Sequence, residues 1–445
     1  MKKKSTTENS LVDIVLRNRR RIFLVALLLI GFFIRFYYAD KFVKESGDLR
    51  LYADWGEKFW EYGSKNFYFV KEWYYAPPNY PPILSLIYAG SYWLFDHKYV
   101  LAQIHNATRL VPAVFIIYFY DHGYYLLLKL PGIMADLGLA YLIYKVVFEL
   151  TKNTKRSLIA FSFYLFNPIS IFLSGAWGQT DSLVSLFGIL SFLVLFSRYI
   201  WLSIPLLFIS FYIKPNWGLF IPLYLFILFG KKPKFKYVGF GIIMSVIIFI
   251  VTTLPFSQGS VLSFSKYLLE SRILPTASIT HKASVSAFNF HTIFFEIDRT
   301  SDEEPVLGIP ANIFGIIIFI LVNVVSFWYS RKQKYNIKSL MVALFLIGFS
   351  GYLFLTNMLE RYFFAGFVPL IIIGFTNTRL LVYLLLINLA TFLNLVYAFF
   401  RRSVGEIADL FTENDFLAIR VLSTLNLFGF VILLKKFNPI SFKKS

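Results

Sequence analysis

The sequence predicts an all-α fold built as a polytopic bundle of transmembrane helices. Of its 445 residues, 57% are hydrophobic and 16% are charged, and the mean hydropathy is +0.63. Soluble globular proteins carry about 45–50% apolar and roughly 25% charged residues. The composition therefore excludes a water-soluble domain, and the abundance of apolar residues excludes a disordered chain. Because the chain has no cysteine, disulfides and thiolate metal sites are excluded as well.

The apolar runs predict about 11–14 membrane segments, since a helix needs roughly 20 apolar residues to span a bilayer core. The long runs are 22–39, 124–149, 157–173, 180–197, 236–255, 307–330, 338–355, 379–400 and 416–434. The shorter runs, some of which we expect to be re-entrant or interfacial, are 82–96, 109–121, 199–213, 215–229 and 361–375. No linker to a soluble domain is visible, so residues 1–445 are predicted to form one integral-membrane domain.

Basic residues set the predicted orientation of these segments. The net charge is +19, and Lys and Arg gather before the first run, in 152–156, 230–236 and 331–338, and from Lys435 onwards. If the amino terminus is inside, the alternation of the segments brings all of these stretches to the inner side. We therefore expect both termini in the cytoplasm and, in a bacterium, insertion in the cytoplasmic (inner) membrane. The positive charge then indicates orientation and not a nucleic-acid partner.

Two predicted outer loops are long, 40–81 and 256–306, and a third, 401–415, is shorter. Loops beyond about 12–15 residues in a compact fold are usually functional or disordered, and the many aromatic residues here argue against disorder. An apolar residue recurs every four positions in the first loop, at Leu51, Trp55 and Phe59. This spacing predicts an amphipathic helix that lies on the outer leaflet.

Asp48 stands at the start of this predicted helix and has two interpretations. As an N-cap, its carboxylate would accept the free N–H groups of the first helical turn. As a general base, it would lie within hydrogen-bond reach of a hydroxyl group that it activates. The nearby Tyr80-Pro81-Pro82 is interpreted mainly as a corner that opens the following helix.

Lys129 and Asp136 are ionisable residues within the predicted span 124–149, where such groups are expensive and are functional candidates by default. Their separation of seven residues places them on one helix face, about two turns apart. One interpretation is an intramembrane charge pair or a lysine that extends towards the interface. The other is that Lys129 binds a lipid phosphate.

The segment 167–181 places polar residues between two apolar spans, flanked by glycines. Trp177, Gln179 and Asp181 suit contacts with a sugar, because an indole covers a ring face while amide and carboxylate groups bind hydroxyls. The alternative is capping of the following helix by Thr180 or Asp181.

Further candidates lie where short apolar segments begin or end. Lys214 and Arg361 are cations suited to phosphate, Arg361 through its rigid fork of donors. Asn289, in the second long loop, and Glu360 are candidates for sugar or acceptor contacts. The alternative for Glu360 and Arg361 is simple mutual neutralisation at the membrane interface.

The chain shows no metal-ligand spacing among its five histidines and no Gly-rich phosphate loop. No cofactor and no metal site are therefore predicted, although a divalent metal is left open because Asp48 and Asp181 could meet across a site. Without a nucleotide site, an activated sugar donor must come from elsewhere, and a lipid-phosphate sugar fits an outward-facing site.

Seven segments, in this order, resemble the GT-C superfamily of integral-membrane glycosyltransferases. They are GDLRLYADW, NYPP, KLPGIMADLG, NPISIFLSGAWGQTDS, KPNW, AFN and LERYFF, and they cover most of the chain from about residue 48 to 370. The nearest branch comprises bacterial proteins similar to GPI-anchor mannosyltransferases and to dolichyl-phosphate-glucose glucosyltransferases. WGQTD and KLPGIMADLG are the most specific segments. Leu359 is a departure, since related proteins often have His at that position.

The resemblance implies a hexosyltransferase that moves a hexose, mannose-like above all, from a polyprenyl-phosphate sugar to an acceptor hydroxyl with inversion. Asp48 would be the general base. Lys214 and Arg361, with Lys129, would hold the departing phosphate. The implied partners are the lipid-linked donor, a glycan, lipid or protein acceptor, and membrane lipid, with the site facing outward. The remaining residues would bind the sugar or the acceptor: Trp177, Gln179, Asp181, Asn289 and Glu360.

Two other classes of function remain open from the sequence. A multi-span flippase or transporter of lipid-linked glycans would favour an internal repeat, which is not visible here. A polymerase or ligase of the O-antigen type would favour one large outer loop with basic residues. The second long loop offers such residues at Lys266, Arg272, Lys282 and Arg299.

Overall fold

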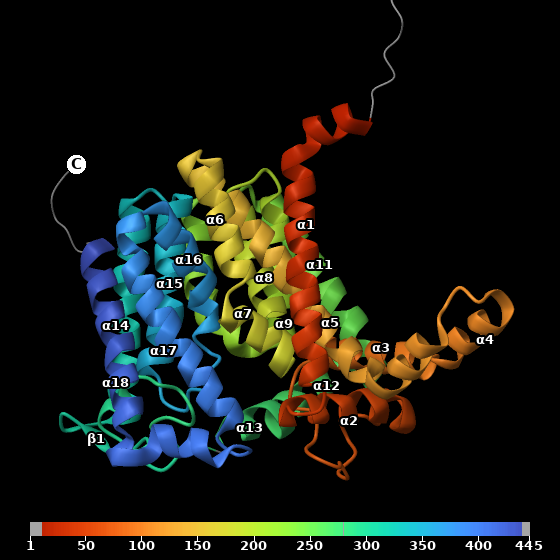
Figure 1. Ribbon diagram of the computed structural model, residues 1–445. Coiled ribbons are helices and arrows are strands. Elements are labelled where there is room, and N and C mark those ends of the chain that lie inside the picture. Colours follow the sequence, from red (N-terminus) through yellow and green to blue (C-terminus); the bar gives the residue numbers. More distant parts are fainter. Residues whose placement is uncertain (1–10, 279, 438–445) are drawn as a thin grey trace, which may run out of the picture.

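The protein, seen in a computed structural model that describes residues 11–278 and 280–437, is a bundle of apolar helices (Figure 1). Seven helices of the described part are long and apolar enough to cross a membrane, or eight if the bent pair Thr154–Leu165 and Pro168–Trp177 is one span. Four shorter apolar helices, of 10–17 residues, accompany them in the same part of the chain. The chain is therefore an integral membrane protein of the predicted all-α, polytopic class.

The bundle has two halves that follow one another in sequence. The first half contains α1 (Leu11–Lys41), α5 (Ala113–Thr151), α6 (Thr154–Leu165), α7 (Pro168–Ile171), the π-helical turn η1 (Phe172–Trp177), α8 (Asp181–Val194), η2 (Ile200–Leu202), α9 (Ser203–Ile213), η3 (Pro215–Phe220), α10 (Ile221–Gly230), α11 (Phe235–Thr253) and η4 (Leu254–Phe256). The second half contains α14 (Ala311–Lys332), α15 (Ile337–Phe354), α16 (Phe364–Thr376), η7 (Thr378–Leu380), α17 (Leu381–Phe400) and α18 (Gly405–Phe437).

The remaining elements lie together at one end of the bundle, away from the start of α1 and the end of α18 (Figure 1). They are α2 (Gly47–Tyr62), α3 (Pro82–Asp96), α4 (Tyr99–Thr108), α12 (Val261–Leu268), η5 (Leu269–Ile273), α13 (Leu274–Ser278), η6 (His291–Ile293), and the two-residue antiparallel strands β1 (Pro305–Val306) and β2 (Ile309–Pro310). We call this the α2 end; the two long predicted loops both belong to it.

The helix α15 forms the centre of the second half, and all its residues from Ser339 to Phe354 are buried. It meets α16 at two glycines: a Cβ atom on Gly348 would lie 2.8 Å from the backbone nitrogen of Gly366. Small residues let helix backbones approach closely where no side chain separates them, as is common between membrane helices. The pair therefore fixes the spacing of the two helices beside the cavity described below.

Residues 82–96 and 109–121, two of the shorter runs among which we expected non-spanning segments, do not form separate spans. Residues 82–96 form α3, which extends sideways with α4 at the α2 end (Figure 1). Residues 113–121 continue without a break into α5, whose 39 residues span about 58 Å at 1.5 Å per residue, well beyond a bilayer core of about 30 Å. Because two predicted segments are lost together, the predicted side of every later loop is unchanged.

The third predicted loop, 401–415, is also partly helical. Residues from Gly405 onwards belong to α18, which is interrupted at Glu413–Phe416, where Asn414, Asp415 and Phe416 have positive φ angles. The part before this break lies across the α2 end, and the part after it runs along the bundle (Figure 1). The break, and not a loop, therefore changes the direction of the chain.

The amphipathic helix predicted from residues 51–59 is confirmed as α2, but its apolar face packs on protein. Trp55 and Phe59 are buried, and Tyr52 stacks on Tyr88 of α3 with ring centroids 4.6 Å apart. The indole N–H of Trp55 donates to the backbone oxygen of Ala76 at 2.8 Å. The helix is thereby anchored to the rest of its loop.

Candidate functional site

Asp48 is presented to the site by the first turn of α2. The N-cap of this helix is Ser46, whose side chain accepts a hydrogen bond from the N–H of Leu49. The interpretation of Asp48 as the cap is therefore wrong, and its carboxylate is available for other contacts. It accepts a hydrogen bond of 2.7 Å from the amide of Gln179 and lies 3.5 Å from the guanidinium of Arg361. The side chain is 34% exposed, so a small molecule can reach it.

Trp177 is the last residue of the π-helical turn η1, and the chain then reverses at Gly178 and leads to Gln179. Gly178 has a φ angle of 77°, in the left-handed region that favours glycine. A Cβ atom there would also lie 3.0 Å from side-chain atoms of both Leu49 and Lys129. Glycine is thus required both by the backbone and by the close approach of α2 and α5.

Asp181 does not act as a helix cap, and neither does Thr180, which makes no side-chain capping bond. The carboxylate of Asp181 forms an ion pair with Lys214, with nitrogen–oxygen distances of 3.0 and 3.2 Å. The amide of Asn216 reaches the same carboxylate at 3.4 Å. Both charged side chains of the pair are 3% exposed, so each neutralises the other away from water.

Glu360 and Arg361 lie in the connection between α15 and α16. They form the predicted neutralising pair, since Arg361 donates to Glu360 at 2.8 Å. Ser286, from the second long loop, also donates to Glu360. The guanidinium of Arg361 lies 5.7 Å from the ring centre of Trp177 and extends to Asp48. It is therefore shared between two carboxylates and one aromatic face.

Four tyrosines surround this cluster, and the sequence pattern did not indicate them as functional: Tyr52 and Tyr88, which are buried, and Tyr80 and Tyr362, which are half-buried. Burial, opposed by the charge of Arg361 and reinforced by those of Asp48 and Asp181, raises the pKa of Tyr80 to about 12. Tyr80 therefore stays protonated at neutral pH and can donate a hydrogen bond. Its position in Asn-Tyr-Pro-Pro was interpreted only as a corner.

A cavity of about 380 Å³ opens beside the cluster. One end is polar and is lined by Asn79, Tyr80, Lys214, Asn216 and Tyr362. The other wall is apolar and comes mainly from α15 and its neighbours: Leu219, Gly348, Gly351, Leu355, Met358 and Ala365. The buried side-chain oxygens of Asn79 and Asn216 have no hydrogen-bond partner among the described residues. Buried polar atoms are nearly always paired, so this end of the cavity is suited to a polar ligand group.

Lys129 is not part of this cluster. Its ammonium group donates to three backbone oxygens, those of Ala39 and Phe42 at the end of α1 and of Ala176 in η1, at 3.0, 2.9 and 2.9 Å. All three of its hydrogen atoms are used, and the side chain is buried. Lys129 therefore joins three chain segments behind Gly178, and we do not retain it as a phosphate ligand.

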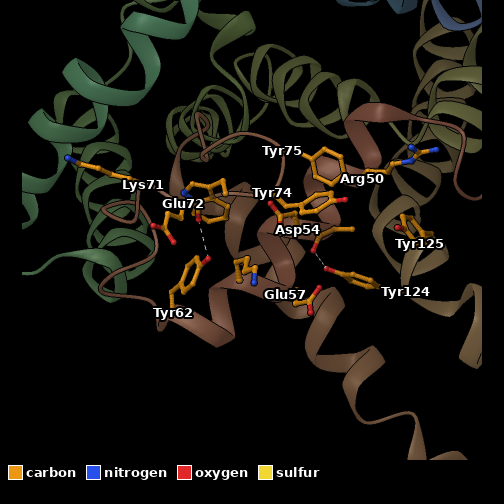
Figure 2. Close-up of a pocket in the computed structure, with 13 residues that line it drawn as sticks. Arg50, Asp54, Glu57, Tyr62, Lys71, Glu72, Tyr74, Tyr75, Tyr124 and Tyr125 are labelled. Atoms are coloured by element: carbon orange, nitrogen blue, oxygen red, sulfur yellow. Dashed lines mark hydrogen bonds between the residues drawn. The ribbon is translucent and has the colours of Figure 1, made fainter. Parts of the chain in front are cut away.

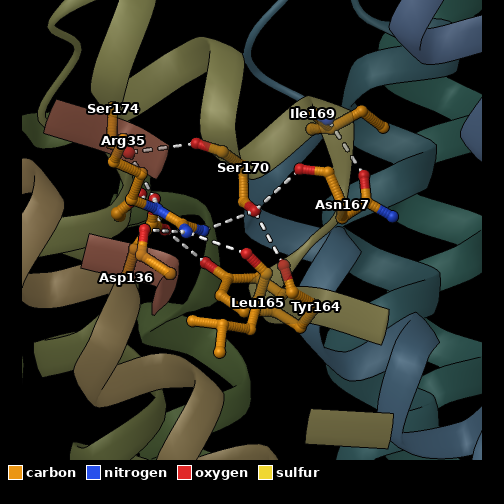
Figure 3. A network of polar contacts seen from close by, with 10 residues as sticks. Arg35, Asp136, Tyr164, Leu165, Asn167, Ile169, Ser170 and Ser174 are labelled. Carbon is orange, nitrogen blue, oxygen red and sulfur yellow. Dashed lines mark hydrogen bonds and ion pairs between the residues drawn. The ribbon is translucent and has the colours of Figure 1, made fainter. Parts of the chain in front are cut away.

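Asp136 pairs with Arg35 and not with Lys129, so that predicted charge pair is wrong. Arg35 donates to Asp136 at 3.1 Å, and both side chains are fully buried (Figure 3). The same carboxylate accepts hydrogen bonds from Tyr164, Ser174 and Ser182. Arg35 was missed by the sequence reasoning, although a single cation within the apolar run 22–39 was a visible signal.

Asn289 also lies apart from the cluster. Its side-chain oxygen accepts the N–H of His291 at 3.1 Å, which folds the second long loop on itself. The loop contributes Ser286 to the site instead, through Glu360. The structure thus brings seven of the nine predicted site residues together: Asp48, Trp177, Gln179, Asp181, Lys214, Glu360 and Arg361.

Within residues 11–278 and 280–437, no group of three or more His, Cys, Asp or Glu side chains could hold a metal ion. Each carboxylate of the cluster faces a cation instead. Searches of the sequence against models of known protein families and against curated proteins find no match.

Proposed function

We propose that the protein is a membrane hexosyltransferase that uses a polyprenyl-phosphate sugar as donor. The observation that carries this proposal is the position of Asp48. Its partly exposed carboxylate lies between the amide of Gln179 and the guanidinium of Arg361, next to a cavity with one polar end and one apolar wall. A lipid phosphate matches this cavity, because it has an anionic head at one end and an apolar tail at the other.

In the proposed reaction, Asp48 accepts the proton of an acceptor hydroxyl, and the hydroxyl oxygen forms a bond to the anomeric carbon. The bond from that carbon to the phosphate oxygen breaks on the opposite side, so the configuration inverts. Negative charge develops on the departing phosphate. Arg361, whose charge is balanced by Glu360, and the hydroxyl groups of Tyr80 and Tyr362 would stabilise it by donating hydrogen bonds. The polyprenyl chain would follow the apolar wall along α15.

Lys214 has a narrower role in this proposal than the sequence suggested. Because its charge is neutralised by Asp181, it can donate a hydrogen bond to the donor but brings no net positive charge. Trp177 and Gln179 would contact the sugar, and Glu360 would hold Arg361 in place. The acceptor, a glycan, lipid or protein, would approach Asp48 from its exposed side.

The proposed orientation places both termini in the cytoplasm and the α2 end outside. It is supported by the position of the basic connections: Gly230, at the end of α10, contacts Tyr335 in the basic turn between α14 and α15. Basic turns thus lie side by side, as expected for a cytoplasmic face. In a bacterium, the membrane would be the cytoplasmic membrane.

The O-antigen type of polymerase receives less support, because the cations of the second long loop have other partners. Arg272 donates to the backbone oxygens of Tyr68 and Val70, and Arg299 pairs with Glu296 at 2.9 Å on the surface. These contacts hold loops together, and both guanidinium groups already have partners within the protein.

The test is an in vitro assay with polyprenyl-phosphate mannose, glucose and other hexoses, offered with membrane lipids and glycans as acceptors. Product mass identifies donor and acceptor. We expect Asp48→Asn to lower product formation by about 10²–10⁴-fold, the range for loss of a general base. Glu61→Gln, at the exposed end of the same helix, is the matched control and should retain activity. Activity of Asp48→Asn within about twofold of the parent would refute Asp48 as the base.

A further inference from the structure

A second and larger cavity lies on the other face of α2. It has a volume of about 670 Å³ and is bounded by α2, by residues 71–75 and by the aromatic pair Tyr124 and Tyr125 of α5 (Figure 2). Glu57, in its wall, follows Asp48 by nine residues, or about two and a half helical turns, and so lies on the opposite side of α2. We call this cavity the α2 groove. It is separate from the candidate site.

Aromatic side chains form much of the wall of the α2 groove: Tyr62, Trp73, Tyr74, Tyr75, Tyr124 and Tyr125 (Figure 2). Tyr74 is 81% exposed and Tyr75 is 49% exposed. Their rings meet edge to face, with centroids 4.8 Å apart. Large exposed rings gathered in one concave surface mark a place for a ligand, because single exposed apolar residues are ordinary but clusters are not.

The charged side chains of the α2 groove are balanced. Its bases are Arg50, Lys58 and Lys71, and its acids are Asp54, Glu57 and Glu72, so the formal sum is 3 − 3 = 0. A surface with no net charge does not concentrate polyanions such as nucleic acid or anionic lipid. Carboxylates beside guanidinium and ammonium groups instead offer acceptors and donors together, which suits a ligand rich in hydroxyl groups.

Asp54 independently indicates that the α2 groove holds a ligand, because one of its carboxylate oxygens lacks a hydrogen-bond donor. The residue is only 8% exposed, and its side-chain oxygen Oδ2 has no hydrogen-bond partner in the part of the chain that is described. It lines the α2 groove between Tyr74 and Glu57 (Figure 2). A buried acceptor without a donor is costly, and a ligand hydroxyl that enters the groove would satisfy it.

We propose that the α2 groove binds a neutral carbohydrate. The rings of Tyr74 and Tyr75 cover the apolar faces of the sugar rings, and Asp54 and Glu57 accept hydrogen bonds from its hydroxyl groups. An apolar tail would take water away from the six charged side chains without offering a hydrogen bond to any of them, so the groove is not suited to a lipid chain. This binding does not rest on the proposed transfer reaction, because no residue of the groove belongs to the candidate site.

The test uses the full-length protein in a detergent without a sugar head group. The probes are the neutral trisaccharides mannotriose, maltotriose, cellotriose and chitotriose, with heparin as the anionic comparison, and binding is measured by saturation-transfer NMR and calorimetry. We expect at least one trisaccharide to bind. Tyr74→Ala/Tyr75→Ala should lower its affinity at least about tenfold, or about 1.4 kcal/mol. Glu57→Gln, a surface change that retains side-chain shape, should weaken binding of the trisaccharide as well.

Two controls separate this proposal from the transfer reaction and from general effects. Tyr99→Ala removes a 62% exposed tyrosine of α4 outside the groove and should leave binding unchanged. Asp48→Asn should bind as the parent does, even if it has lost transfer activity. The proposal is overturned if none of the four trisaccharides binds at millimolar concentration, if the double variant binds them as well as the parent, or if heparin binds more tightly than all four.

Discussion

Replacement of Asp136 by alanine should destabilise the protein by about 3–5 kcal/mol, because it leaves the buried guanidinium of Arg35 without its counter-charge. The carboxylate of Asp136 accepts four hydrogen bonds, from Arg35, Tyr164, Ser174 and Ser182. At about 1.5–3 kcal/mol for each bond to a charged group, four independent bonds would total about 6–12 kcal/mol.

The smaller figure is expected because several partners keep other contacts. Arg35 still donates to the backbone oxygen of Leu165 and to the hydroxyl of Ser170, both at 2.8 Å. Ser174 still donates to the backbone oxygen of Ser170 at 3.0 Å. What remains is the cost of one buried charge that has lost its partner, which is the 3–5 kcal/mol range.

The measurement is equilibrium unfolding in mixed micelles, followed by tryptophan fluorescence, as a double-mutant cycle. Arg35→Met/Asp136→Leu removes both charges and should cost clearly less than Asp136→Ala alone. Glu149→Ala is the control on the same helix, since Glu149 is 62% exposed and pairs with Lys152 at the surface. It should change stability by about 0–1 kcal/mol. A double variant as unstable as the sum of its single variants would refute the reasoning.

Two further changes test the packing and the electrostatics around the site. A Cβ atom on Gly188 would lie 2.1 Å from the ring of Trp217, so Gly188→Ala should destabilise the protein by about 1–3 kcal/mol. Gly90 lies in open space on α3, so Gly90→Ala should stabilise the protein by about 0.5–1 kcal/mol. Chemical denaturation measures both changes. Burial raises the pKa of Asp54, although the backbone N–H of Tyr75 and the charge of Lys58 oppose the shift. Native stability is therefore lost as pH rises through the folded-state pKa, and Asp54→Asn should raise the melting temperature at pH 7 but not below about pH 3.9, where the carboxyl is protonated in both states. An equal effect at both pH values would contradict this assignment.

Much of the site could be predicted because charged residues in an apolar chain are few and expensive. Asp48, Gln179, Asp181, Lys214 and Arg361 were all chosen as polar groups at the ends of apolar segments, and all of them converge. The sequence also indicated α2 correctly, since its apolar period of about four residues is local information.

Contacts between distant segments could not be predicted in the same way. A shared helix face suggested that Asp136 pairs with Lys129, but the actual partner of Asp136, Arg35, precedes it by 101 residues. Spacing along one helix says nothing about which neighbouring helix packs against it. Lys129 instead satisfies the last carbonyls of another helix, a role that depends on where that helix ends.

The sequence also did not show where one helix continues and where it ends. The predicted runs 109–121 and 124–149 were separated at His122 and Gly123, yet these two residues lie inside α5. Such residues are tolerated in a helix that projects beyond the apolar layer, so composition does not distinguish the two cases. The same error occurred in the predicted loop 401–415, where residues from Gly405 onwards are helical up to the break at Glu413–Phe416.

The three contacts of Lys129 have a consequence for how the site can open. The ammonium joins the end of α1, the π-helical turn η1 and α5 at one point. Trp177 and Gln179, which follow directly, are thereby fixed to the frame of the bundle. Asp48 and Arg361 are attached to α2 and to the α15–α16 connection, neither of which shares this anchor. Any motion that admits a substrate is therefore expected to carry the carboxylate and the guanidinium away from a stationary amide, so that the separation of Asp48 from Gln179 reports whether the site is open.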